Sequence, residues 1–81
     1  MGDTDQLRKV AEHHHSEAQT HRKKGAEYHK TAEKADLAGK KRAAKEFRAM
    51  GDAELKIAAS QHAEGDRLKM MADIYDEVPE E

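Results

Sequence analysis

A helical path without charge runs through the first half of the chain and limits what the chain can fold into. Steps of four and three residues, which follow one face of an α-helix, lead from Leu7 to Gly39. The path comprises Leu7, Ala11, His14, Ala18, His21, Gly25, Tyr28, Ala32, Ala35 and Gly39. Charged residues make up 40% of the chain, so ten random positions would include about four of them, whereas this path includes none. The pattern predicts a long helix with one buried face.

The second half repeats this pattern, with a single charge on the path at Glu54. The positions are Ala44, Phe47, Gly51, Glu54, Ala58, Gln61, Gly65, Leu68, Ala72 and Tyr75. Gly39 lies between the two paths and favours a helix end, because glycine adopts positive φ without a Cβ clash. We therefore expect one all-α domain over residues 1–81, a long antiparallel two-helix hairpin with a close-packed Ala/Gly seam. Its predicted parts are a helix over about 4–37 with a cap at Asp3 or Thr4, a turn over 38–41, a helix over about 42–76 and an acidic tail over 77–81.

The sizes of the residues on the two paths predict how the helices meet. Every second position is Ala or Gly in both halves. If the chain folds back at Gly39 so that the numbers of facing residues sum to 79, nearly every large residue faces a small one. Examples are Leu7 with Ala72, His14 with Gly65, Tyr28 with Gly51 and Ala32 with Phe47. We expect this alternation to bring the helices close together along a long seam.

Composition argues against several classes of protein. Cysteine is absent, which excludes disulfides and thiolate chemistry. No apolar run approaches the ~18 residues that a bilayer span needs, and the first five residues lack the pattern of a signal peptide, so we expect a cytoplasmic protein without membrane contact. Ser16 and Ser60 are the only serines, and a hairpin offers no concave pocket for catalysis. We expect neither an enzyme nor a cofactor.

Six histidines in 81 residues raise the question of a metal site. His13, Glu17 and His21 follow one another at intervals of four and are the weak candidates for ligands, although the two ends of this set lie ~12 Å apart on a helix. The interpretation we favour is structural. His14 and His21 lie on the seam, where we expect hydrogen bonds across the hairpin, for example to Gln61.

Basic residues gather in the middle of the sequence. Residues 22–48 contain ten Lys and Arg against four Asp and Glu, a net charge of +6, and the other residues have a net charge of −8. In a hairpin the turn end would therefore be basic and the opposite end acidic. This distribution predicts a contact with the phosphates of RNA or DNA. The candidate residues are Arg22, Lys23, Lys24, Lys40, Lys41, Arg42, Lys45 and Arg48.

Apolar residues outside the two paths indicate a partner surface on the second helix. The candidates border the small-residue positions and are Met50, Ile57, Met71, Ile74 and Val78. A two-helix hairpin cannot cover all of them, and a hairpin of this composition is marginally stable alone. We expect a protein partner or a second copy of the chain, which would form a homo-oligomer such as a four-helix bundle.

A set of mostly small residues between positions 17 and 65 is typical of one known helical family. The matching residues are Glu17, Ala18, His21, Ala32, Ala35, Gly39, Ala44, Phe47, Gly51 and His62. They resemble the helical domain of unknown function that usually precedes the Smr (small MutS-related) nuclease domain. The Asp-x-His-Gly-type motif of the Smr domain itself is absent. The resemblance implies an accessory role in nucleic-acid binding.

Three functional hypotheses follow from the sequence. The first is a non-catalytic helical interaction module that binds a protein partner or itself through the second helix. The alternative is a nucleic-acid-binding accessory domain that uses the basic turn end. The second alternative is a histidine-based metal binder.

Overall fold

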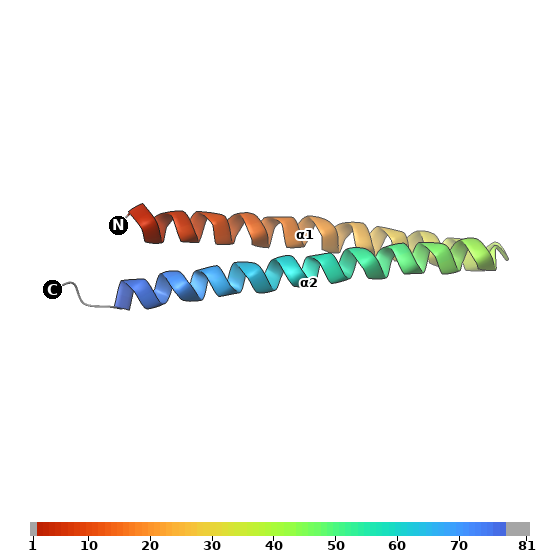
Figure 1. Ribbon diagram of the computed structural model, residues 1–81. Coiled ribbons are helices and arrows are strands. Elements are labelled where there is room, and N and C mark those ends of the chain that lie inside the picture. Colours follow the sequence, from red (N-terminus) through yellow and green to blue (C-terminus); the bar gives the residue numbers. More distant parts are fainter. Residues whose placement is uncertain (1, 78–81) are drawn as a thin grey trace.

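The chain folds into two long antiparallel α-helices, as the computed structural model shows for residues 2–77 (Figure 1). Helix α1 spans Gly2–Leu37 and helix α2 spans Lys41–Glu77. The two helices lie side by side and form a rod of 68 × 13 × 11 Å. The predicted all-α two-helix hairpin is therefore confirmed. The acidic tail expected beyond Glu77 and the partner candidate Val78 lie outside the described residues.

The turn between the helices forms where the sequence predicted it. Gly39 has a positive φ of 77°. Its backbone N–H donates to the carbonyl oxygen of Asp36 at 3.0 Å, and the N–H of Lys40 donates to that of Ala35 at 2.8 Å. This pair of bonds is a Schellman motif, which satisfies the last carbonyl groups of α1. At the other end of α1 the helix already begins at Gly2, so Asp3 and Thr4 lie in its first turn and the predicted cap at these residues is wrong.

The buried face of each helix consists of small residues alone. Within residues 3–77 the buried positions are Ala11, Ala18, Gly25, Ala32, Ala44, Gly51, Ala58, Gly65 and Ala72. All of them lie on the two helical paths that the sequence predicted to be buried. They form the seam, along which the two backbones approach each other directly.

The predicted register of the seam is wrong, because small residues face small residues. A Cβ atom built on Gly25 would lie 3.1 Å from the carbonyl oxygen of Gly51, and one on Gly65 would lie 3.0 Å from that of Ala11. The numbers of these facing residues sum to 76 rather than 79. Both helices repeat every seven residues, so the pattern permits several registers. The register found brings the two backbones close together at Gly25 with Gly51 and at Ala11 with Gly65, which an alternation of large and small residues would prevent.

Candidate functional site

Two rows of larger side chains lie on either side of the seam, and we name each by its residues. The first flank consists of His14, His21, Tyr28, Phe47, Glu54 and Gln61. The second flank consists of Arg8, His15, His29, Asp36, Arg48, Asp52, His62, Asp66, Asp73 and Asp76. Both flanks join α1 to α2 by polar or aromatic contacts. Since the seam buries only Ala and Gly, these flanks supply the side-chain specificity of the hairpin.

The first flank pairs large residues across the seam. His14 Nδ1 donates to Gln61 Oε1 at 2.5 Å, and His21 Nδ1 donates to Glu54 Oε2 at 2.5 Å. The rings of Tyr28 and Phe47 stack with their centroids 6.3 Å apart. The interpretation of His14 and His21 as seam residues with hydrogen bonds across the hairpin is confirmed, and Gln61 is the partner of His14.

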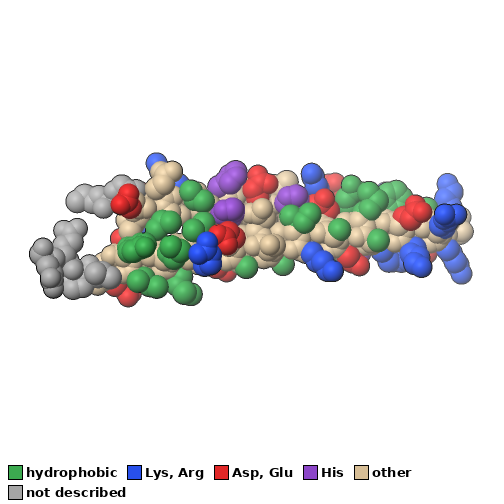
Figure 2. Space-filling model, viewed as in Figure 1, with side chains coloured by type: hydrophobic (Ala, Val, Ile, Leu, Met, Phe, Trp, Pro, Cys, Tyr) green, Lys and Arg blue, Asp and Glu red, His purple; other side chains and the backbone are tan. Residues whose placement is uncertain are grey.

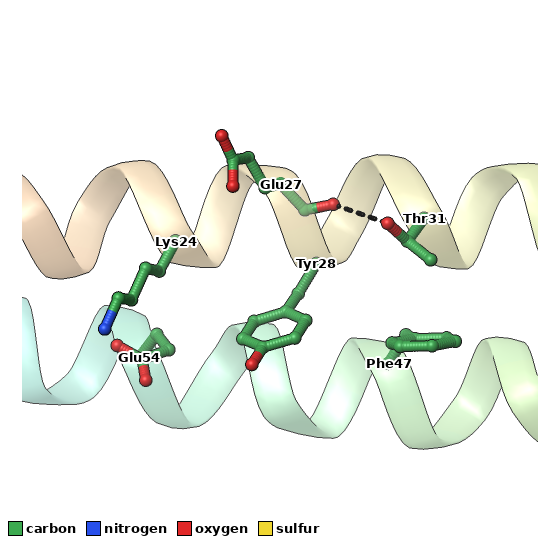
Figure 3. Close-up of a pocket in the computed structure, with 6 residues that line it drawn as sticks. All are labelled: Lys24, Glu27, Tyr28, Thr31, Phe47 and Glu54. Carbon is green, nitrogen blue, oxygen red and sulfur yellow. Dashed lines mark hydrogen bonds between the residues drawn. The ribbon is translucent and has the colours of Figure 1, made fainter.

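An open hollow lies beside the aromatic pair on the first flank (Figure 3). Its walls are formed by Lys24, Glu27, Tyr28, Thr31, Phe47 and Glu54. Thr31 Oγ1 donates to the backbone carbonyl of Glu27 at 3.1 Å, so this hydroxyl satisfies its own helix. The hollow is bordered by the two aromatic rings, and its walls contain neither serine nor cysteine.

The second flank contains a cluster that joins two imidazoles to one carboxylate. His15 Nε2 lies 3.0 Å from Asp66 Oδ1, and His62 Nε2 lies 3.2 Å from Asp66 Oδ2. The two imidazole rings are 5.0 Å apart and tilted by 31°. His15 comes from α1, whereas His62 and Asp66 are one turn apart on α2. We call these three residues the His–His–Asp cluster.

Gly65 makes room for this cluster. A Cβ atom on Gly65 would lie 2.6 Å from His15 Nε2, which is far inside van der Waals contact. The ring of His15 therefore lies flat over the bare backbone of Gly65, and its Nε2 atom reaches the neighbouring Asp66. Any other residue at position 65 would push the ring outward.

The same arrangement occurs a second time, fourteen residues closer to the turn on each helix. His29 lies over Gly51, whose Cβ would be 2.8 Å from His29 Nε2, and His29 Nε2 is 3.0 Å from Asp52 Oδ1. The position that corresponds to His62 is occupied by Arg48, which pairs with Asp36 instead. The second arrangement therefore has one imidazole where the first has two.

The metal candidates predicted from sequence do not form a cluster. His13 Nε2 and His21 Nε2 each lie 3.9 Å from an oxygen of Glu17, which is too far for a hydrogen bond. His21 is hydrogen-bonded to Glu54. Among residues 2–77, the group whose ligand atoms all lie within 4.8 Å of one another is the His–His–Asp cluster instead. The spacing of His62 and Asp66 was visible in the sequence, but His15 lies outside the two paths, and its contact with Asp66 runs diagonally between the helices because the two numbers sum to 81 rather than 76.

The basic residues lie along the turn half of the rod and do not form a single patch (Figure 2). Arg22, Lys23 and Lys24 lie about 24 Å from the turn along α1. Arg48 pairs with Asp36, and Arg42 approaches Glu46 at 3.7 Å. Lys40, Lys41 and Lys45 are exposed beside the turn. In the described part of the chain no lysine forms an ion pair.

The apolar candidates on α2 lie largely at the surface. Met50, Ile57 and Ile74 are exposed by 43%, 42% and 54%, and Met71 is half-buried. Six of the eight exposed large hydrophobic residues lie on α2, and only Val10 and Leu37 lie on α1. The outward surface of the hairpin is thus asymmetric, with α2 as its apolar side.

One ion pair lies among these apolar residues. Arg67 Nη2 donates to Glu64 Oε1 at 2.5 Å and Arg67 Nε donates to Glu64 Oε2 at 3.1 Å. The guanidinium lowers the pKa of the Glu64 carboxyl, chiefly through these hydrogen bonds. A third nitrogen, Arg67 Nη1, lies 3.5 Å from the sulfur of Met71.

No family model, curated protein or solved structure matches the chain. The resemblance to the helical domain that precedes Smr domains stays a prediction. Neither α1 nor α2 is apolar enough over its length to cross a membrane.

Proposed function

We propose that this chain is a non-catalytic helical interaction module that binds a second copy of itself through α2. The observation that carries the proposal is an apolar stripe on α2 that the hairpin leaves uncovered. We define the stripe by steps of three and four residues: Met50, Ala53, Ile57, Ser60, Glu64, Arg67, Met71 and Ile74. Such a heptad spacing is the pattern by which one helix packs against another.

The stripe is suited to a helix partner in its chemistry. Six of its eight positions are exposed and two are half-buried. Its two charged residues, Glu64 and Arg67, neutralise each other. A partner helix would therefore meet apolar and small side chains at the ends and a satisfied ion pair in the middle. The charged outer surface of α1 offers no comparable run.

Charge supports a second copy in the antiparallel orientation. The net charge is +6 over residues 22–48 and −8 over the rest of the chain, so the rod is a strong electric dipole. Two parallel copies would place the two basic ends side by side, whereas two antiparallel copies point their basic ends in opposite directions. In this orientation Met50 would meet the partner subunit's Ile74, and Ala53 would meet the partner subunit's Met71. The result would be a four-helix bundle.

Oligomeric state and orientation can be tested separately. We expect a dimer by light scattering, and a monomer after Ile57→Lys, because the substitution replaces an apolar side chain of the stripe with a charge. Val10→Lys places the same charge at an exposed apolar position on α1 and should leave the dimer intact. A monomeric wild-type chain at high concentration would refute self-association, and the interaction face would then be free for another protein.

The absence of cysteine allows a direct test of orientation. Met50→Cys and Ile74→Cys copies should form a mixed disulfide with each other when they are combined, because these positions meet only in the antiparallel dimer. Met50→Cys alone should remain uncrosslinked. A rapid disulfide in the Met50→Cys chain alone would indicate parallel copies.

A second candidate function is contact with a nucleic-acid backbone through the basic half. The observation in its favour is that Lys23, Lys24, Lys40, Lys41 and Lys45 form no ion pair among the described residues. Unpaired lysines can replace the counterions of a phosphate backbone. This function uses the end of the rod rather than the apolar stripe.

A further inference from the structure

We infer that His15, His62 and Asp66 form a binding site for one divalent transition-metal ion of the Zn²⁺ class, which clamps α1 to α2. The inference is independent of the proposed self-association, because the cluster lies on the second flank and the apolar stripe does not. It rests on the convergence of three ligand atoms from two helices. It also rests on a space that a side chain at position 65 would fill.

The distances between the ligand atoms fit one ion. A tetrahedral ion with metal–ligand bonds of about 2.0–2.1 Å holds its ligand atoms about 3.3 Å apart. The observed separations of Asp66 oxygens from His15 Nε2 and His62 Nε2 are 3.0 and 3.2 Å, and all three ligand atoms lie within 4.8 Å of one another. Small side-chain rotations would therefore place an ion between them.

The ligand set selects the class of metal. Two imidazole nitrogens with one carboxylate oxygen suit Zn²⁺, Co²⁺, Ni²⁺ and Cu²⁺, whereas Ca²⁺ and Mg²⁺ require oxygen ligands. Binding requires that each Nε2 presents its lone pair, so the proton that bonds to Asp66 shifts to Nδ1 or leaves. Three protein ligands leave one position of a tetrahedral ion for water.

Gly65 positions one ligand of the proposed site, and His62 is the feature that distinguishes this site. The space that a Cβ atom of residue 65 would occupy is taken by the Nε2 and Cδ2 atoms of His15. Because glycine leaves this space open, His15 Nε2 can point toward Asp66 and His62. A hairpin that needed only a surface hydrogen bond between His15 and Asp66 would not require the second imidazole of His62, which comes within 3.2 Å of the same carboxylate.

The chain contains its own control in the arrangement of His29, Gly51 and Asp52. It has the same imidazole over glycine and the same 3.0 Å contact with a carboxylate, but Arg48 stands where the second imidazole would be. The proposal therefore predicts binding at the first arrangement and none at the second. If any histidine beside an aspartate bound metal, both arrangements would bind it.

The experiment is a calorimetric titration of the tag-free full chain with Zn²⁺, together with thermal melts in Zn²⁺ and in Mg²⁺. We expect one Zn²⁺ per chain and a melting temperature that rises with Zn²⁺ and not with Mg²⁺, because an ion that binds only the folded state stabilises it. His62→Gln should weaken binding at least tenfold, and the matched variant His29→Gln should leave it unchanged. Co²⁺ should give the visible absorption of a tetrahedral ion, lost in the first variant only.

A gain of binding provides a second test that does not depend on damage to the fold. Arg48→His supplies the missing imidazole to the second arrangement and should raise the stoichiometry from one ion to two. The proposal is overturned if Zn²⁺ does not bind, if His62→Gln binds as well as wild type, or if His13→Gln alone abolishes binding. The last result would mean that the exposed run His13–His15 takes up metal adventitiously.

Discussion

Gly25 and Gly51 face each other across the seam, and a Cβ atom on Gly51 would lie 3.0 Å from the carbonyl oxygen of Gly25. The same Cβ would meet the ring of His29, with its Nε2 atom at 2.8 Å. Backbone blocks one side of this position and an imidazole the other. The two backbones therefore lie in close contact at this pair of glycines.

A larger residue at position 51 should separate the helices. Gly51→Leu would force the backbone of α1 away and displace His29, and overpacking of this kind typically lowers the free energy of unfolding by ~1–3 kcal/mol. Circular dichroism melts would measure the loss. Ala26→Leu is the matched control, because Ala26 is exposed and follows the facing glycine. Equal melting temperatures for the two variants would show that position 51 does not face α1.

The hydrogen bond between His21 and Glu54 should appear as a coupling energy. Both side chains are only about one-fifth exposed, at 22% and 20%, so removal of one leaves the other poorly solvated. His21→Leu and Glu54→Leu should each destabilise the hairpin, and the double variant should lose less than the sum of the two. A double-mutant cycle from urea unfolding should give a coupling of about 1 kcal/mol. If the two single substitutions changed the free energy of unfolding in a strictly additive way, the contact between His21 and Glu54 would be contradicted.

Acid should weaken the open end of the hairpin through Asp76. Hydrogen bonds from Arg8, at 2.6 Å, lower the pKa of the Asp76 carboxyl below its usual value. A carboxyl with a lowered pKa in the folded state stabilises the fold above its unfolded pKa of about 3.9 and loses that contribution as pH falls through the folded pKa. The melting temperatures of wild type and Arg8→Gln should therefore differ at neutral pH and converge below about pH 4. Lys9→Gln, which removes a lysine that forms no ion pair with any residue between 2 and 77, should show no such convergence.

Nucleic-acid contact through the basic half should depend on salt and not on base sequence. The double variant Lys40→Glu, Lys41→Glu should weaken binding equally for all probes. It should also reduce the slope of log K against log salt concentration by roughly one unit for each lost phosphate contact. Both residues are exposed, with Lys40 directly before α2 and Lys41 as its first residue, so helicity should stay unchanged. Fluorescence anisotropy at low salt, with RNA and DNA of several lengths, measures the effect. Failure of every probe to bind wild type would end this hypothesis.

The helices and the turn could be predicted from the sequence, whereas the register between the two helices could not. Gly39 marked the turn, because only a residue that tolerates positive φ ends a helix in this way. The two helical paths marked the nine buried positions. The register could not be read, since a seven-residue repeat in both helices looks the same after several shifts. The contact of His15 with Asp66 was missed for another reason, because His15 lies outside both paths and the contact runs diagonally between the helices. The hydrogen bond from His14 to Gln61 was found because both residues are polar members of otherwise apolar paths.

The opposed seven-residue repeats also make the rod divisible into equal modules. Removal of seven residues from α1 together with the seven that face them on α2 would leave every remaining small pair, such as Ala11 with Gly65, in its present alignment. The hairpin would become shorter by about 10 Å, while the turn and the open end kept their structures. The span of the hairpin can therefore change only in fixed steps, and insertions or deletions should be tolerated only when both helices change by the same multiple of seven residues.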